Sequence, residues 1–376
     1  MRIERVNLHL LEGRLDRPFA YSRAWFDRRM ALLVEVVSTD GLSGWGETYG
    51  PARMHVGVIE DLKPLLIGAD PLRSEFLWQE IYSTYRDHGQ KGLLIQALSG
   101  IDIALWDLKG KHFGVPVHRL MGGPLRSEVP AYATGLYRQR EGDPEQYLVE
   151  EAVGYAAEGF PAMKLKVGFG VDEDARLVRA IRKAIGPHRG LMIDANHAYD
   201  AVSSIRLARR IEDCDIGWFE EPVPPEDVDG YLRVKRAQAI PVAGGECEFT
   251  RFGFRDLLVR RAVDILQPDI CSAGGLSECK KIADMAHAFG VRYNPHVWGT
   301  GVAIAASLQL LAVLPDTPLS LAPTPPMLEF DRTEHPIRQA ILCEPIQHRR
   351  GTVAVPQGPG LGIDIDRQAI ERFRAS

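Results

Sequence analysis

Polar side chains recur at the ends of short apolar runs in the middle of the chain, at intervals of 23 to 33 residues. In chain order they are Lys164 with Lys166, then Asp194, Glu220, Glu246, Asp269, His296 and Glu329. Each interval has the length of one strand and one helix. Parallel strands joined in this way present their carboxyl ends on the same side, where active sites form. We therefore expect these residues to meet at one site.

Three of these residues are carboxylates on successive runs, namely Asp194, Glu220 and Glu246. Carboxylates held a few ångströms apart repel one another and raise one another's pKa values, and a divalent cation removes that cost. Oxygen ligands suit a hard ion, whereas Zn²⁺ prefers His or Cys. The set predicts a Mg²⁺ site, with Mn²⁺ as a substitute. The alternative for any one carboxylate alone is a helix cap or an arginine partner.

The sequence Lys164-Leu165-Lys166 lies inside an apolar run. Side chains alternate along a strand, so the two lysines face the same way and Leu165 faces the other. The chain has only ten lysines, which makes two in one apolar run a sign of function rather than of a solvated surface. A second ammonium and a nearby cation lower a lysine pKa, so one lysine is expected to serve as a base.

Asp269 and His296 end neighbouring runs. A carboxylate in that position can orient and charge the imidazole. The pair predicts a second proton-transfer group across the site from the lysines. Glu329 follows a Pro-rich segment and is expected to complete the site, whereas Glu221 should point away by strand alternation and be structural.

The same regular spacing predicts the fold. Apolar runs alternate with helix-like segments from residue 129 onward. Repeated strand–helix alternation predicts a parallel sheet covered by helices. Seven or eight units favour a closed (β/α)7–8 barrel of the TIM type over an open sheet.

The first part of the chain is expected to form an α+β capping domain. It has strand-like patches at 2–11 and 31–38, followed by helical patterns at 56–67, 72–85 and 93–114. We predict a capping domain over 1–128 and a catalytic barrel over 129–340. A Gly- and Pro-rich segment over 341–376 should return to the capping domain.

Composition excludes several classes of protein. The net charge of −5 and a pI near 6.1 argue against a dedicated nucleic-acid binder. No apolar stretch is long enough to span a membrane, and no apolar segment typical of a signal peptide follows Met1. The five cysteines form no CxxC pair, which favours a reduced, cytoplasmic protein.

Taken together, the motifs resemble those of the enolase superfamily, and within it the mandelate racemase subgroup. The matching segments are Lys164-Leu-Lys166, Asp194-Ala-Asn196, Trp218-Phe-Glu220-Glu-Pro222, Gly245-Glu246, Gln267-Pro-Asp269 and Pro295-His296. Further similarity to acid-sugar enzymes of this subgroup lies in residues 97–112, 295–302, 329–333 and 358–363. The resemblance covers the whole chain.

The resemblance implies a metal-assisted proton abstraction. Asp194, Glu220 and Glu246 would bind Mg²⁺, which would chelate a substrate carboxylate and stabilise the enediolate formed when the α-proton leaves. Lys166 would be the base on one face, and Lys164 would share the enolate charge.

The remaining residues receive roles by the same resemblance. His296, held by Asp269, would be the acid or base on the other face, and Glu329 would donate a hydrogen bond if protonated. The N-terminal segment should close over the mouth and confer specificity. The expected substrate-binding residues are Asn196, Arg23, Arg53, His55 and Trp298, with the two arginines and His55 facing a distal carboxylate.

The reaction implied in first place is a cycloisomerisation, in which the lactone of a sugar diacid loses its ring oxygen by β-elimination and becomes a keto-deoxy aldarate. An aldarate or aldonate dehydratase would use the same groups to expel water. A racemase or epimerase, or a catalytically silent barrel, are further alternatives. The partners expected are a small acid-sugar substrate and further copies of the chain, since homo-oligomers are common in the family.

Overall fold

The computed structural model describes residues 1–318 and 320–375. The N-terminal part is an antiparallel sheet in the order β3-β2-β1-β5, covered by helices. Its elements are β1 (Ile3–Ala20), β2 (Trp25–Ser38), β3 (Ser43–Thr48), α1 (Ala52–Leu66), α2 (Ser74–Tyr85), α3 (Leu93–Phe113), α4 (Val117–Leu120) and β5 (Arg138–Gln139). The three helices confirm the patterns seen in the sequence. β1 and β2 are longer than expected.

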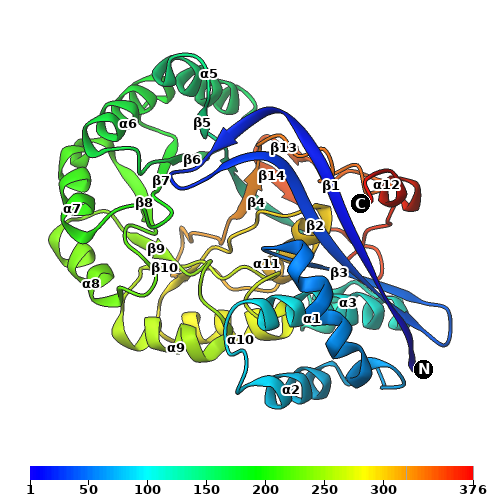
Figure 1. Cartoon of the computed structure of the whole chain (residues 1–376). Coiled ribbons are helices and arrows are strands. Elements are labelled where there is room, and N and C mark those ends of the chain that lie inside the picture. Colours follow the sequence, from blue (N-terminus) through cyan, green and yellow to red (C-terminus); the bar gives the residue numbers. More distant parts are fainter. Residues whose placement is uncertain (319, 376) are drawn as a thin grey trace.

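The extra length of β1 and β2 forms a polar hairpin arm. Its strands pair from Glu12 opposite Met30 to Ala20 opposite Trp25, with an irregularity between Arg14 and Phe19. Backbone hydrogen bonds join the two strands, and Leu15 and Phe19 of the arm are buried in a small cluster with Tyr137. Polar residues separate these apolar ones in the sequence, so hydrophobic patterning does not reveal the arm. In Figure 1 the arm reaches across toward β6 and β7. Its tip is anchored there because the Ser22 hydroxyl donates to the backbone oxygen of Ala195 (2.8 Å).

Eight parallel strands form the second part. β4 pairs with β6 on one side and with β12 on the other, and β6 to β11 follow in sequence order. The strands are β4 (Glu128–Thr134), β6 (Ala162–Lys166), β7 (Gly190–Asp194), β8 (Ile216–Glu220), β9 (Val242–Gly244), β10 (Ile265–Leu266), β11 (Arg292–Tyr293) and β12 (Leu328–Asp331).

Side chains rather than a strand ladder link β11 to β12. The Asn294 side-chain oxygen accepts from the Met327 backbone N–H (2.8 Å), and a Glu329 carboxylate oxygen accepts from Val297 (2.9 Å). Helices surround the strands in Figure 1, which confirms the TIM-type barrel. They are α5 (Pro144–Ala157), α6 (Val171–Ile185), α7 (Ala201–Arg210), the short η1 (Glu212–Cys214), α8 (Val228–Ala237), α9 (Thr250–Arg260), α10 (Gly275–Ala288) and α11 (Gly301–Leu311).

An apolar floor fills the barrel beneath the predicted site. It consists of six side chains from consecutive strands: Tyr132, Ala162, Met192, Trp218, Ala243 and Ile265. Lys164, Asp194 and Glu220 each lie two residues after a floor residue. Because strand side chains alternate, these three point into the barrel above the floor.

The C-terminal segment contacts both parts. β13 (His348–Arg349) and β14 (Thr352–Ala354) form a hairpin whose second strand pairs with β4. After α12 (Arg367–Arg372), the backbone oxygen of Phe373 accepts from Glu12 and the N–H of Ala375 donates to Leu10, both at 2.8 Å. The segment therefore reaches β1 but also extends the barrel sheet. The proposed division into 1–128, 129–340 and 341–376 stays a prediction.

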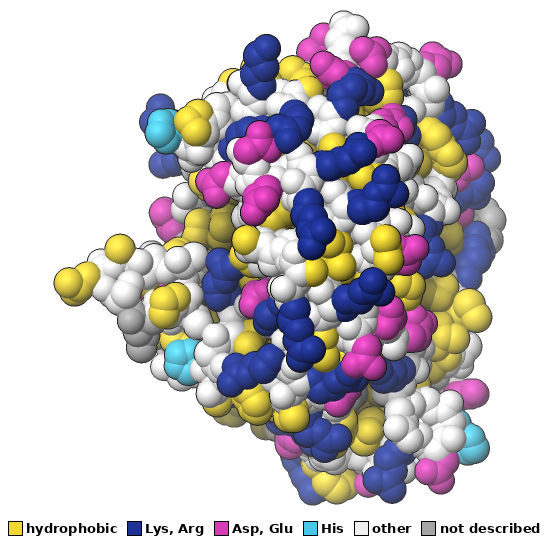
Figure 2. Space-filling model, turned by 90° about the vertical axis from the view of Figure 1, so that its left-hand side faces the viewer, with side chains coloured by type: hydrophobic (Ala, Val, Ile, Leu, Met, Phe, Trp, Pro, Cys, Tyr) yellow, Lys and Arg dark blue, Asp and Glu magenta, His cyan; other side chains and the backbone are white. Residues whose placement is uncertain are grey.

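The outer surface over the barrel helices carries charges of both signs. Figure 2 shows Lys and Arg side chains intermixed with Asp and Glu on this face. Several of the arginines are paired, such as Arg179 with Asp213 and Arg176 with Glu145. Within residues 1–318 and 320–375, no helix is both long and apolar enough to cross a membrane.

β3 approaches the backbone of α3 closely at Gly46. A Cβ added at Gly46 of β3 would overlap the backbone oxygen of Gly100 in α3. We expect Gly46→Ala to lower the free energy of unfolding by about 1–3 kcal/mol, the usual cost of overpacking. Urea denaturation measures this change.

Gly57 provides the matched control. It is exposed in α1, and a Cβ there would meet nothing within 4 Å. Gly57→Ala should raise the stability by about 0.5–1 kcal/mol because alanine favours a helix. Equal effects of the two substitutions would contradict close packing of β3 on α3.

Candidate active site

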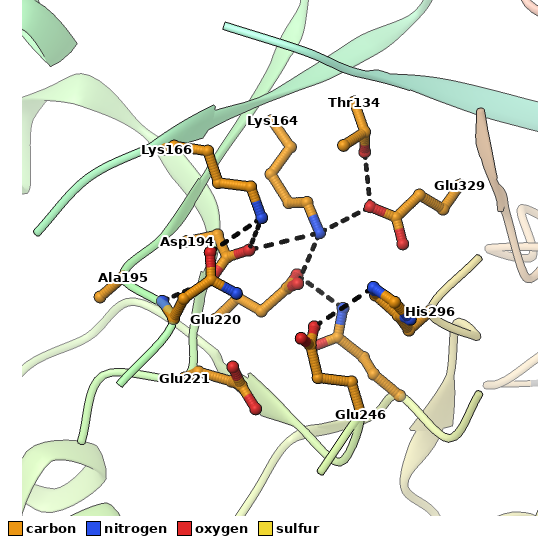
Figure 3. Close-up of polar contacts among 12 residues, drawn as sticks. Thr134, Lys164, Lys166, Asp194, Ala195, Glu220, Glu221, Glu246, His296 and Glu329 are labelled. Carbon is orange, nitrogen blue, oxygen red and sulfur yellow. Dashed lines mark hydrogen bonds and ion pairs between the residues drawn. The ribbon is translucent and has the colours of Figure 1, made fainter. Parts of the chain in front are cut away.

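The polar residues identified from the sequence converge at the carboxyl ends of the strands (Figure 3). The Lys164 ammonium contacts Glu220 (2.5 Å) and Glu329 (2.8 Å). The Lys166 ammonium donates to Asp194 (2.5 Å) and to the side-chain oxygen of Asn196 (2.9 Å). Both lysines thus face the barrel axis, as strand alternation predicts, and they lie among the carboxylates rather than in solvent.

Three carboxylates form a compact acidic group. Asp194, Glu220 and Glu246 each offer an oxygen within 4.8 Å of the others, and all three side chains are buried. Asp194 and Glu220 end β7 and β8. Glu246 lies beyond the short β9, on a turn where Gly245 has a φ of +135° and packs against the Gln267 backbone. Only glycine adopts that conformation readily.

The charges of this group are unevenly compensated. Burial and, to a smaller extent, neighbouring carboxylates raise the pKa of Glu246 and of Glu220 to about 7, although Lys164 opposes the shift at Glu220 and His296 opposes it at Glu246. Burial acts in the same direction at Asp194, but Lys166 and Lys164 outweigh it and lower the pKa to about 2. Three buried carboxylates without nitrogen or sulfur ligands fit a hard divalent cation such as Mg²⁺.

Two side chains orient Glu220. The Trp218 indole N–H (2.9 Å) and the Gln267 amide (2.7 Å) both donate to the same carboxylate oxygen, Oε2. Lys164 contacts the other oxygen. Hydrogen bonds of this kind hold a ligating carboxylate in place. Gln267 belongs to a motif noted in the sequence, but nothing in its spacing indicates this contact.

The lysine pKa values differ from the sequence expectation. Burial lowers the pKa of each lysine, but carboxylates outweigh it, chiefly Glu220 at Lys164 and Asp194 at Lys166, and the pKa of both is raised. The expectation of a lowered lysine pKa considered the second ammonium and a cation. It did not include the carboxylates that directly contact each ammonium.

Asp269 and His296 form a hydrogen-bonded pair, as the sequence suggested. The imidazole Nδ1 lies 2.6 Å from an Asp269 oxygen, and the other Asp269 oxygen accepts from the backbone of Cys271 (2.6 Å). Burial alone would lower the pKa of His296, but Glu246, Glu329 and Asp269 raise it to about 10. Nε2 points toward Glu246 at 3.6 Å. The ring can therefore hold a proton toward the centre of the site.

Glu329 is placed to accept hydrogen bonds rather than to donate one. It accepts from the Thr134 hydroxyl (2.6 Å) and the Val297 backbone (2.9 Å), besides its contact with Lys164. Burial raises its pKa, but Lys164 and His296 lower it to about 2. The protonated donor suggested from the sequence is therefore inconsistent with these contacts.

A cavity of about 420 Å³ adjoins the site between the hairpin arm and the barrel mouth. Tyr21 and Phe26 from the arm line one side, and Asp269 and Trp298 line the barrel side. Tyr49 also borders it, with its ring 5.1 Å from the His296 ring. The cavity therefore adjoins the His296 side of the site through Asp269 and Tyr49. The sequence indicated Trp298 but not Tyr49, which lies in a turn without a recognisable pattern.

Three residues expected to bind substrate do not line this cavity, and their role stays a prediction. Arg23, Arg53 and His55 are not among the described residues that line the cavity. Arg23 is exposed, and Arg53 is an exposed residue of α1 that pairs with Glu12 (3.2 Å). His55 is fully buried inside the capping domain.

Two side chains hold the His55 ring. Thr48 Oγ1 and Gln96 Oε1 each lie 3.0 Å from one of its nitrogens. The spacing of α1 places His55 on the apolar face of the helix, which the sequence interpretation did not consider. By contrast, Asn196 contacts Lys166 and Trp298 lines the cavity. The substrate-binding roles of these residues stay predictions.

A second group of potential metal ligands lies beside the first. His197, Glu221 and Cys247 offer atoms within 4.8 Å of one another, and His197 pairs with Glu221 at 2.8 Å. Figure 3 shows Glu221 set apart from the lysines and from Glu329. Glu221 and Cys247, which directly follow Glu220 and Glu246, belong to this second group, and Glu221 still acts electrostatically on Glu246. His197 engages Glu221 rather than the cavity.

The chain matches two family descriptions that together cover most of its length. Residues 5–122 match the "Mandelate racemase / muconate lactonizing enzyme, N-terminal domain", and residues 147–369 match the "Enolase C-terminal domain-like" family. The chain belongs to the mandelate racemase group of the enolase superfamily. It is therefore an enzyme of a superfamily whose sites combine a Lys or His base with Mg²⁺.

Known relatives extend over the whole chain. It is 51% identical over 374 residues to D-galactarolactone cycloisomerase from Agrobacterium fabrum (strain C58), covering 100% of this chain and 99% of the relative. It is 34% identical to arabinonate dehydratase from Saccharolobus solfataricus, covering 90% and 89%. The crystal structure of 3,6-anhydro-D-galactonate cycloisomerase from Zobellia galactanivorans superposes with a TM-score of 0.91 at 43% identity, covering 100% of both chains.

The acidic group predicts how metal binding responds to substitution. Glu220→Gln should weaken Mg²⁺ binding by about 100-fold or more, beyond the 10–100-fold losses typical of changes outside the ligand shell. Isothermal titration calorimetry measures the Kd, and circular dichroism verifies folding.

Glu221→Gln is the matched control, since Glu221 is adjacent in sequence but pairs with His197. Its loss of Mg²⁺ affinity should stay below about 100-fold, the upper end of losses for changes outside the ligand shell, and below that of Glu220→Gln. Equal loss in both variants would contradict the assignment of Glu220 as the ligand.

Proposed function

We propose that the chain is a Mg²⁺-dependent cycloisomerase that opens the lactone ring of a sugar diacid by β-elimination. The observation that carries the proposal is the arrangement of two proton-transfer groups around one acidic group. Lys166 lies at its Asp194 end, and His296 at its Glu246 end. The 51% identity to D-galactarolactone cycloisomerase supports the choice of substrate class.

The acidic group would hold the ion and, through it, the substrate carboxylate. Asp194, Glu220 and Glu246 would be the ligands. When bound, Mg²⁺ would withdraw charge from the substrate carboxylate and so make the adjacent C–H bond more acidic. Lys164, on the same strand face as Lys166, would place a fixed positive charge where negative charge develops.

The two proton-transfer groups would act on opposite faces of the substrate. With Mg²⁺ on the acidic group, Asp194 and Glu246 would no longer raise the pKa of Lys166 and His296 to the same extent. One of the two groups would then take the proton next to the carboxylate, and the other would deliver a proton after the ring has opened. Asp269 would hold the His296 imidazole by its Nδ1–H and so keep Nε2 directed at the substrate. A positioned acid or base of this kind contributes about 10²–10⁴-fold to a rate.

Loss of water from a linear sugar acid is the second candidate function. It would need the same residues, and the similarity to arabinonate dehydratase favours it. The difference lies in the leaving group, which is a hydroxyl in a dehydratase and a ring oxygen in a cycloisomerase. Two of the similar proteins carry the name cycloisomerase, which places ring opening first. Assembly into a homo-oligomer stays a prediction.

Proton NMR in D₂O with Mg²⁺ tests the proposed function. Galactaro- and glucarolactones should be consumed and give a ring-opened keto-deoxy diacid, while linear aldarates and aldonates remain. EDTA should abolish the reaction and added Mg²⁺ restore it. Consumption of linear acids alone would assign the chain as a dehydratase, and α-exchange without net product would indicate a racemase.

The two-face arrangement predicts distinct losses. Lys166→Ala and His296→Asn should each reduce turnover by about 10²–10⁴-fold. In D₂O, one variant should lose α-proton exchange and the other should retain exchange without completing the reaction. The controls are Lys183→Ala and His188→Asn, whose side chains are exposed outside the site. Full activity in both active-site variants would refute the arrangement.

A further inference from the structure

Two buried arginines share one carboxylate at the edge of the cavity. Arg29 of β2 is 4% exposed and lies 3.5 Å from Asp331 of β12. Arg338, 9% exposed, pairs with the same Asp331 oxygen. We call Arg29, Asp331 and Arg338 the arginine cluster. Two guanidiniums and one carboxylate leave the cluster with one positive charge in excess.

The other contacts of the cluster do not neutralise this charge. Arg29 donates to the Thr333 hydroxyl (3.1 Å), and Arg338 donates to the Thr333 backbone oxygen (3.0 Å). Burial lowers the pKa of the nearby His335, and Arg29 and Arg338 lower it further, which keeps its ring neutral. A buried charge without a counter-ion is costly, so the surplus calls for an anion.

The cluster borders the cavity that adjoins the His296 side of the site, where Asp269 and Tyr49 contact the imidazole. Arg29 lines that cavity together with Asp269 and Tyr49. Its guanidinium lies 3.7 Å from the centre of the Trp298 ring, and Trp298 comes two residues after His296. None of the substrate-binding residues expected from the sequence supplies a buried positive charge here.

We propose that Arg29 forms an anion subsite that receives the carboxylate released when the lactone ring opens. The inference rests on the proposed function and adds to it a site for the leaving group. A substrate held by its own carboxylate at the acidic group would extend its lactone end into the cavity toward Arg29.

The leaving group follows from the bonds that change. A base removes the α-proton, and the C–H electron pair becomes a double bond to the β-carbon as the bond from that carbon to the ring oxygen breaks. The electron pair of the broken bond stays on the oxygen. Because this oxygen belongs to the lactone acyl group, it leaves as a carboxylate and needs no proton. The enol product becomes a ketone by gaining a proton at the β-carbon and losing its hydroxyl proton.

The charge at this end therefore appears during the reaction. The lactone is neutral there, whereas the product carries a carboxylate. A fixed cation that meets charge only as it develops lowers the barrier more than it strengthens substrate binding. A dehydratase would gain no rate from such a subsite, because its hydroxide departs with a proton and no carboxylate is formed, although a linear diacid would gain binding. The subsite thus favours lactones over linear monoacids.

Arg29→Met tests the subsite. The substitution leaves Asp331 paired with Arg338, so the remaining cluster is neutral and the variant should fold. With a galactarolactone and Mg²⁺, kcat should fall by about 10²–10³-fold, as for other preorganised charges, while KM changes by less than about 3-fold. In calorimetry, galactarate should lose its affinity advantage over galactonate, because only the diacid offers a second carboxylate.

Arg28→Met is the matched control. Arg28 also borders the cavity, but its side chain is 45% exposed and pairs with Glu12 (3.0 Å) and Asp27 (3.1 Å). It should retain wild-type kcat and the preference for galactarate. Arg29→Lys keeps the positive charge but not the planar guanidinium that can donate two parallel hydrogen bonds to a carboxylate. Its kcat should lie between those of Arg29→Met and the wild type.

The outcomes separate the subsite from the proposed function. If the wild type opens the lactone and Arg29→Met does so at the same kcat, the subsite is wrong and the function stands. If the wild type opens no lactone, the function is wrong, and the diacid preference alone decides the subsite: its loss in Arg29→Met supports it, and its persistence overturns it. If Arg29→Met does not fold, the same comparisons made with Arg29→Lys decide.

Discussion

The structure depends on the mutual compensation of charges buried in the barrel mouth. Lys164 pairs with Glu220, Glu329 and Asp194. Lys166 also pairs with Asp194, and His296 faces Glu246 at 3.6 Å. Removing one partner of a buried ion pair commonly costs about 3–5 kcal/mol because the other charge is left uncompensated. The apolar floor beneath prevents water from providing that compensation. The arrangement therefore tolerates few substitutions, and a divalent cation is the natural additional partner for the acidic group.

Much of the barrel site was predictable because local geometry determines it. Alternation along β6 places Lys164 and Lys166 on one face, and a repeat of 26 residues places Asp194 and Glu220 at successive strand ends. Glu246, Asp269 and His296 lie beyond strands of only two or three residues. Their convergence rests on the repeat rather than on alternation, and it was still correctly anticipated. Periodicity alone is sufficient for these positions because each is close to its own strand.

Residues of the capping domain were poorly predicted because no local pattern connects them to the barrel. His55 and Tyr49 are six residues apart, yet the first is enclosed inside the cap and the second contacts His296. Which of them reaches the cavity depends on how the cap packs on the barrel. Protonation was misjudged for a related reason. The pKa values of Glu329 and the lysines depend on all neighbouring charges, and these come from strands far apart in the sequence.

The arginine cluster combines residues of the cap and of the barrel. Arg29 comes from β2 of the cap, whereas Asp331 ends β12, two residues after Glu329. The ion pair between them links the cap to the barrel. Because Arg338 also pairs with Asp331, one positive charge remains in excess, and Arg29 is the member of the cluster that lines the cavity. The same residue, Arg29, would therefore both hold the cap on the barrel and bind the anion. A relative with the same acidic group but a different residue at the Arg29 position could keep proton abstraction and change the leaving group, since the barrel supplies the first and the cap the second.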